Sequence, residues 1–71
     1  MDERVQARMT QVRNLRALEH LLSNQIDAAV SSGENPRVLK RKRAEVRVTL
    51  EDAEGALSHE IILAQLEGAT L

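Results

Sequence analysis

The chain has 71 residues, no cysteine, no aromatic residue and a formal net charge of −1. This length allows one small domain, and the absence of cysteine excludes disulfides and thiolate metal sites as its supports. Small domains without such supports commonly depend on association. A composition with 30% charged residues beside Leu, Ile, Val and Ala is typical of coiled-coil-like helical proteins.

No apolar run approaches the roughly 20 residues that a membrane-spanning helix needs. The first residues do not form the apolar core of a secretory signal peptide. We therefore expect no membrane partner and no signal-directed secretion, and a location in the cytoplasm or within a virion or other assembled complex.

The first half of the chain carries apolar residues in steps of three and four, which predicts an amphipathic helix over about residues 3–30. Asp2 is its candidate N-cap. The apolar positions are Val5, Met9, Val12, Leu15, Leu18, Leu22, Ile26 and Ala29.

Residues 31–35 have the composition of a tight turn between two helices. Gly33 suits the left-handed conformation that ends a helix. Asn35 suits the N-cap of the next helix, and Pro36 suits its first position, where no backbone N–H is needed. The sequence predicts that the chain stops, turns and begins a second helix here.

The second helix is predicted over about residues 36–67. Gly55 lies inside it and costs about 1 kcal/mol relative to Ala, which suggests a close approach by a neighbour. The apolar positions again follow helical spacing at Leu39, Val46, Leu50, Ala53, Leu57, Ile61 and Ala64.

Facing positions in an antiparallel hairpin have residue numbers with a constant sum, and the two apolar stripes match at 68. The same register opposes charges of opposite sign at Asp27 and Arg41, at Arg16 and Asp52, and at Arg8 and Glu60. The fold class is therefore all-α, a single antiparallel two-helix hairpin over residues 1–71. Its predicted seam is Leu15, Leu18, Leu22, Val46, Leu50 and Leu57.

Two helices can cover only one stripe on each other, and several large apolar residues remain outside it. One interpretation folds them over the start of the first helix. The favoured interpretation makes them a partner interface, at which self-association or a partner helix completes a helical bundle. The predicted interface residues are Leu21, Ile62, Leu63 and Leu66, and Leu71 adds to them.

Six of the ten Lys and Arg residues lie between positions 37 and 47. Three interpretations remain open: a solvated face, a dock for an acidic protein surface, or a contact with nucleic-acid phosphates. Missing aromatic side chains for base stacking make nucleic acid the less favoured partner. The candidate docking residues are Lys40, Arg41, Arg43 and Arg47.

No catalytic, cofactor-binding or metal-binding motif is found, so we expect no enzyme, no cofactor and no small-molecule substrate. In the hairpin register, His20 and His59 lie too far apart along the axis to share a metal ion. The pair His59 and Glu60 lacks the second histidine of the zinc motif H-E-x-x-H.

The turn at 31–36 and the leucine spacing resemble those of small helical hairpins. Examples are Rop-like RNA-binding regulators of plasmid copy number, co-chaperones of type III secretion needles and phage scaffolding proteins. The resemblance is architectural, covers most of the chain and transfers no residue role. It implies a structural or assembly protein of a phage particle or secretion apparatus. The alternatives are a dimeric nucleic-acid-binding regulator and a helix-shielding co-chaperone.

Overall fold

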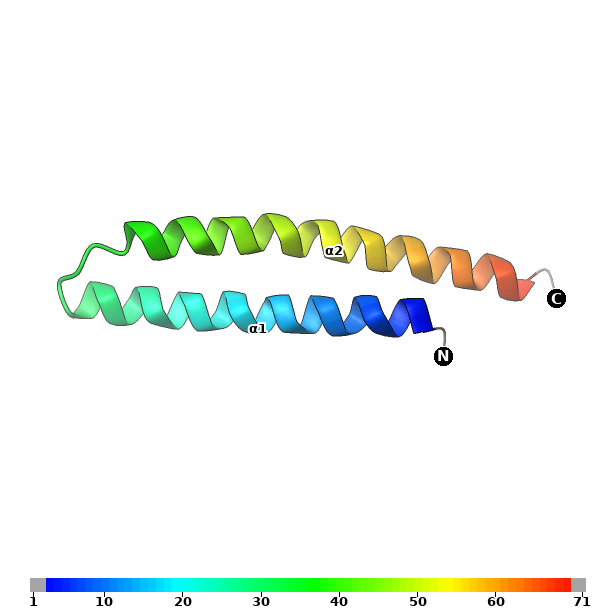
Figure 1. Ribbon diagram of the computed structural model, residues 1–71, viewed down its shortest axis with the longest axis horizontal. Coiled ribbons are helices and arrows are strands. Elements are labelled where there is room, and N and C mark those ends of the chain that lie inside the picture. Colours follow the sequence, from blue (N-terminus) through cyan, green and yellow to red (C-terminus); the bar gives the residue numbers. More distant parts are fainter. Residues whose placement is uncertain (1–2, 70–71) are drawn as a thin grey trace.

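The computed structural model describes residues 3–69, which form two helices packed antiparallel (Figure 1). Helix α1 spans Glu3–Ser31 and helix α2 spans Arg37–Ala69. The predicted all-helical hairpin is confirmed, and its helices lie close to the ranges predicted for them. The candidate cap Asp2 and the apolar Leu71 lie outside the described residues.

The turn has the predicted chemistry. Gly33 adopts a φ of 76°, the left-handed conformation that ends α1. The N–H of Glu34 donates to the carbonyl oxygen of Ala29 at 2.8 Å, so one of the last carbonyls of α1 is satisfied. Asn35 Oδ1 accepts a hydrogen bond from the N–H of Arg37 at 3.1 Å and caps α2. This local hydrogen bonding reverses the chain.

The seam between the helices follows an unbroken alternation of three- and four-residue steps, the coiled-coil repeat. Every position of the repeat is buried or half-buried. In α1 these positions are Val5, Arg8, Val12, Leu15, Glu19, Leu22, Ile26 and Ala29. In α2 they are Leu39, Arg43, Val46, Leu50, Ala53, Leu57, Glu60 and Ala64.

The prediction that Leu18 belongs to the seam is wrong. Leu18 is 41% exposed, and Glu19 is half-buried in its place. The reason is geometric, because a strict 3.5-residue repeat keeps a stripe facing its partner only if the steps alternate. Two successive steps of three, from Val12 to Leu15 to Leu18, move Leu18 to the flank of the seam. The other five predicted seam residues are buried or half-buried.

The predicted charge pairs are also wrong in detail. Arg16 pairs with Glu54 at 3.5 Å instead of Asp52, and Arg8 donates to Gln11 instead of Glu60. Asp27 and Arg41 form no ion pair within residues 3–69. Long side chains can reach partners one turn away. The residue that faces an arginine in the register is therefore not always the carboxylate with which it pairs. For the pairs that bridge the two helices, the residue numbers still sum to values between 64 and 71.

The core is thin because the molecule is a single layer of two helices, 60 Å long and 11 Å across its shortest axis. Its central cluster is Val12, Leu50 and Ala53, with Leu15 and Leu57 packed against it. A two-helix layer has only one internal stripe, so the outer surface of each helix is open to solvent.

Candidate functional site

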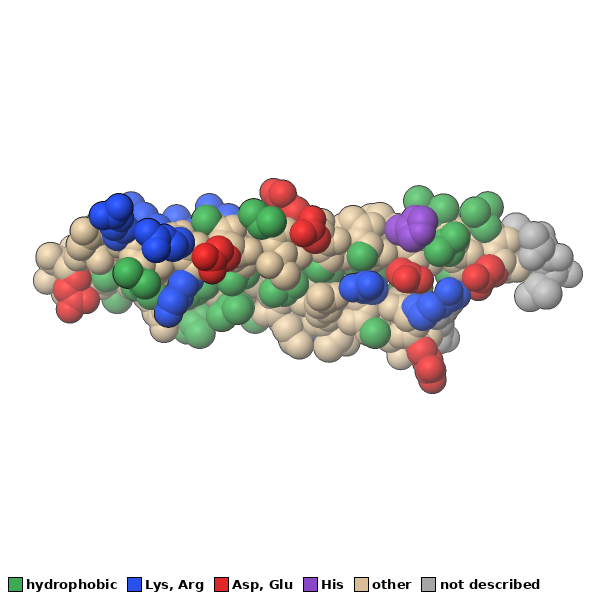
Figure 2. Space-filling model, turned by 45° about the horizontal axis from the view of Figure 1, so that its top comes forward, with side chains coloured by type: hydrophobic (Ala, Val, Ile, Leu, Met, Phe, Trp, Pro, Cys, Tyr) green, Lys and Arg blue, Asp and Glu red, His purple; other side chains and the backbone are tan. Residues whose placement is uncertain are grey.

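The end of the hairpin opposite the turn, the open end, exposes a group of large apolar side chains. Helix α2 continues past the first residue of α1 there (Figure 1), so the described part of α1 does not extend alongside the end of α2. Ile62 is 54% exposed, Leu66 is 59% exposed and Leu63 is half-buried. We call Ile61, Ile62, Leu63 and Leu66 the open-end patch. Figure 2 shows hydrophobic side chains gathered at this end of the molecule.

Leu21 does not belong to the open-end patch, although it was predicted as part of the same interface. It is 53% exposed and lies on α1, near the level of Arg47 in the hairpin register. At about 1.5 Å per residue, roughly 28 Å along the axis separates that level from Leu66. The structure therefore divides the predicted interface into an end patch and a separate leucine on α1.

The four predicted docking cations divide into two pairs. Arg43 Nη1 donates to Ser23 Oγ at 3.3 Å, and Arg47 Nε donates to Glu19 Oε1 at 3.3 Å. Both side chains thus bridge the two helices. Lys40 and Arg41 are exposed, and no carboxylate of the described part of the chain pairs with them.

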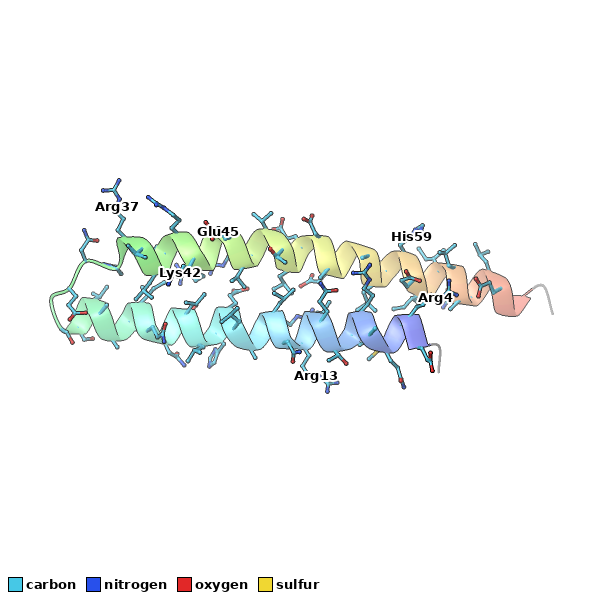
Figure 3. The ribbon with its side chains drawn as sticks, viewed as in Figure 1. Arg4, Arg13, Arg37, Lys42, Glu45 and His59 are labelled. Atoms are coloured by element: carbon cyan, nitrogen blue, oxygen red, sulfur yellow. The ribbon has the colours of Figure 1, made fainter. Side chains whose placement is uncertain are left out.

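Two cations that the prediction left out join this exposed group. Arg37 and Lys42 are exposed and have no ion-pair partner within residues 3–69. Arg37 points away from α1 in Figure 3, and Figure 2 shows basic side chains gathered at the turn end. We call Arg37, Lys40, Arg41 and Lys42 the basic end. Their positions in the first turns of α2 were visible in the sequence, but their freedom from carboxylates was not.

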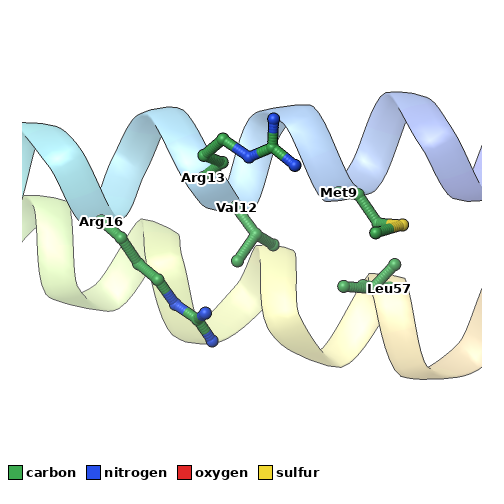
Figure 4. Close-up of a pocket in the computed structure, with 5 residues that line it drawn as sticks. All are labelled: Met9, Val12, Arg13, Arg16 and Leu57. Atoms are coloured by element: carbon green, nitrogen blue, oxygen red, sulfur yellow. The ribbon is translucent and has the colours of Figure 1, made fainter.

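A shallow groove of about 240 Å³ lies across the seam towards the open end (Figure 4). Met9, Val12 and Leu57 form its apolar floor, and Arg13 and Arg16 stand at its edge. The sequence prediction counted Met9 only as part of the apolar stripe of the first helix and did not include this groove. Apolar contacts beside guanidinium groups suit an apolar side chain that carries or adjoins a carboxylate.

One charged seam residue is poorly satisfied. Glu60 Oε2 is buried and accepts no hydrogen bond from the described residues, and Arg4 Nε lies 3.9 Å away. Arg4 Nη2 instead donates to Glu67 Oε2 at 3.0 Å. Leaving a buried carboxylate oxygen without a hydrogen bond is costly, so the seam is less complete near the open end.

The described residues contain no group of three His, Cys, Asp or Glu side chains placed to hold a metal ion. His20 and His59 are both exposed, and His59 points away from α1 (Figure 3). Within residues 3–69, neither helix contains a stretch long and apolar enough to span a bilayer.

No protein-family model matches the sequence, and neither a curated protein nor a solved structure matches it. The functional argument therefore rests on the surfaces described above.

Proposed function

We propose that the chain is a non-enzymatic assembly module, a helical hairpin that packs its uncovered apolar surface against protein in a larger complex. A virion, a secretion apparatus or another cytoplasmic assembly would provide such a setting. The observation that carries the proposal is the exposure of Ile62 and Leu66, at 54% and 59%, on an otherwise well-formed helix.

The energetic argument supports association. Burying one large aliphatic side chain is worth about 1.5–3 kcal/mol, and the open-end patch offers three exposed ones, Ile61, Ile62 and Leu66. Within the described part of the hairpin these side chains remain 39–59% exposed. Contact with another helix would cover them and complete a bundle layer.

The test is sedimentation of the pure chain and of a Leu63→Asp, Leu66→Asp double variant. We expect the parent to associate and the double variant to sediment as a monomer with its helicity largely kept. A charge placed in an apolar interface must be desolvated without a partner, which opposes association.

The control is Gln65→Asp, which adds one such charge in the same turn but replaces a polar, exposed residue. It should associate like the parent. A double variant that sediments like the parent would refute the proposal, and so would a parent that stays monomeric at every concentration.

A second candidate function, electrostatic docking to phosphates or to an acidic protein, is favoured by the basic end. Its four cations have no carboxylate partners in the described part of the chain, whereas Arg43 and Arg47 are engaged across the seam. This candidate predicts nucleic-acid binding that weakens steeply with salt and is reduced by Arg41→Glu. The control Arg13→Glu adds the same charge change on the other helix. Absence of binding at low salt would remove the nucleic-acid form of this candidate.

A further inference from the structure

The charges of α1 are confined to part of its circumference. Between Val5 and Ser31, every ionisable residue lies in the seam or on the flank that continues from Arg16 to Arg13. At 3.6 residues per turn, the remaining side of the helix is uncharged for roughly seven turns. We call this side the charge-free face. Its central row is Gln11, Asn14, Leu18, Leu21 and Gln25, with Ala7 and Ala28 at the two ends, and all seven residues are exposed.

The two flanks of the seam therefore differ. Arg16 and Ser23 lie on one flank, and both bond across to α2, to Glu54 and Arg43. Leu18 lies on the opposite flank at the edge of the charge-free face. A solvent-facing surface of a 29-residue helix in a chain with 30% charged residues would normally carry charges. Depletion of charge is the compositional mark of the core of a protein interface.

The central row of this face has nearly the same order of residue types when it is read from either end. From Ala7 to Ala28 it runs Ala, Gln, Asn, Leu, Leu, Gln, Ala. If a second copy of α1 lies antiparallel with Leu18 at the centre, Leu18 meets its own equivalent, Gln11 meets Gln25, and Ala7 meets Ala28. Two-fold dimers require a self-complementary surface of this kind. Gln11 Oε1 accepts a hydrogen bond from Arg8 Nη1 within α1, which leaves its amide N–H groups to donate to Gln25 of the second copy. The alanines allow the helices to approach closely.

The same two-fold axis also accounts for apolar residues on α2. In the hairpin register Leu18 lies level with Leu50, so the axis would cross α2 near Leu50. It would then place Val38 of one copy beside Leu63 of the other. Val38 is 62% exposed at the turn end, and Leu63 belongs to the open-end patch. The turn end of each copy would cover the open end of the other.

We propose that the charge-free face binds a second copy of this chain, with the two α1 helices antiparallel about an axis at Leu18. The result is a four-helix bundle of two hairpins. This inference rests on the proposed assembly function and specifies its partner. A stable interface buries about 800 Å² on each partner, a small part of the 5379 Å² surface of the hairpin. The face extends along most of α1, so that area is available.

The test uses the absence of cysteine from the chain. Leu18→Cys places one thiol at the proposed axis, where two copies bring it next to its equivalent. A disulfide forms only when the two Cα atoms come within about 7 Å. We expect Leu18→Cys to form a covalent dimer on mild oxidation at least tenfold faster than the control Val48→Cys. Val48 is 60% exposed but lies on the outer side of α2.

Helix direction is tested by Gln11→Cys and Gln25→Cys. In the antiparallel arrangement each variant alone should link slowly, and an equimolar mixture should link rapidly into a heterodimer. In a parallel arrangement each would link with itself. Self-linking of Gln11→Cys as fast as its linking with Gln25→Cys would therefore overturn the inference.

The outcomes also separate this inference from the proposed function. If the parent sediments as an oligomer but Leu18→Cys links no faster than Val48→Cys, the second copy sits elsewhere. The inference then fails while the assembly proposal stands. If the parent is monomeric at every concentration, both fail. Circular dichroism of each cysteine variant verifies that the hairpin is intact.

Discussion

The two ends of the hairpin are built differently. At the turn end, Ile26 and Ala29 are buried, at 4% and 7% exposure, and backbone hydrogen bonds close the connection. At the open end, α2 continues beyond α1, and Ile62 and Leu66 remain more than half exposed. The chain thus closes the turn end by its own backbone hydrogen bonds and a buried pair, although Val30 and Val38 are exposed beside them. The open end has no such closure.

The difference follows from where covalent connection helps packing. Residues next to a short turn are held close together, so little further entropy is lost when they pack. The open end has no such connection, and charged residues occupy its seam, at Arg8 and Glu60. Stability within one molecule should therefore concentrate at the turn end, and the open end should gain more from contact with a second molecule.

The largest expected loss of stability comes from a substitution in the core of the turn end. Ile26→Ala should lower the free energy of unfolding by about 2–5 kcal/mol, because it leaves a cavity beside a nearly fully buried position. Urea titration followed by circular dichroism measures this loss, which should be the same at every protein concentration. Its control is Ile62→Ala, which should cost less than about 0.5 kcal/mol in dilute solution and more as the protein associates. Equal losses for both variants in dilute solution would contradict the comparison.

A smaller effect is expected in the turn itself. Gly33→Ala should destabilise the hairpin by about 1–2 kcal/mol, since a side chain is disfavoured at a φ of 76°. Gly33→Asn is the matched variant and should lose less, because Asn tolerates the left-handed conformation better. The midpoint of urea unfolding measures both. An unchanged midpoint for Gly33→Ala would show that the turn adapts without cost.

The smallest expected effect is a gain in stability, and it concerns a residue towards the open end. Gly55 had suggested a close neighbour, but a Cβ added there would meet nothing within 4 Å. Gly55→Ala should therefore stabilise the helix by about 0.5–1 kcal/mol, seen as a higher urea midpoint. A loss of stability that grows with protein concentration would instead place a second molecule against Gly55.

Much of the fold was predictable because its determinants are local. Gly33, Asn35 and Pro36 act through their own backbone conformation and hydrogen bonds, which neighbouring residues alone establish. The two helical stripes were predictable for a related reason, since a helix places residues three and four apart on one face.

Which residues of each helix face the seam was harder to predict from the sequence. Leu18 is the more apolar choice and Glu19 the correct one, because only contact with a second helix requires the alternating steps. The Glu19 carboxylate is tolerated there because Arg47 reaches it from α2 at 3.3 Å. Such compensation depends on which long side chains the packed helices bring together.

The sequence by itself determined two amphipathic helices, the turn between them and their antiparallel pairing, since helical periodicity and capping act over a few residues. Only the tertiary structure decided which cations are free, which leucines are covered and which face of α1 lies opposite the ion-paired flank. Those properties depend on the rotation of each helix about its axis. That rotation is set by the balance of packing along the whole seam, not by any single residue.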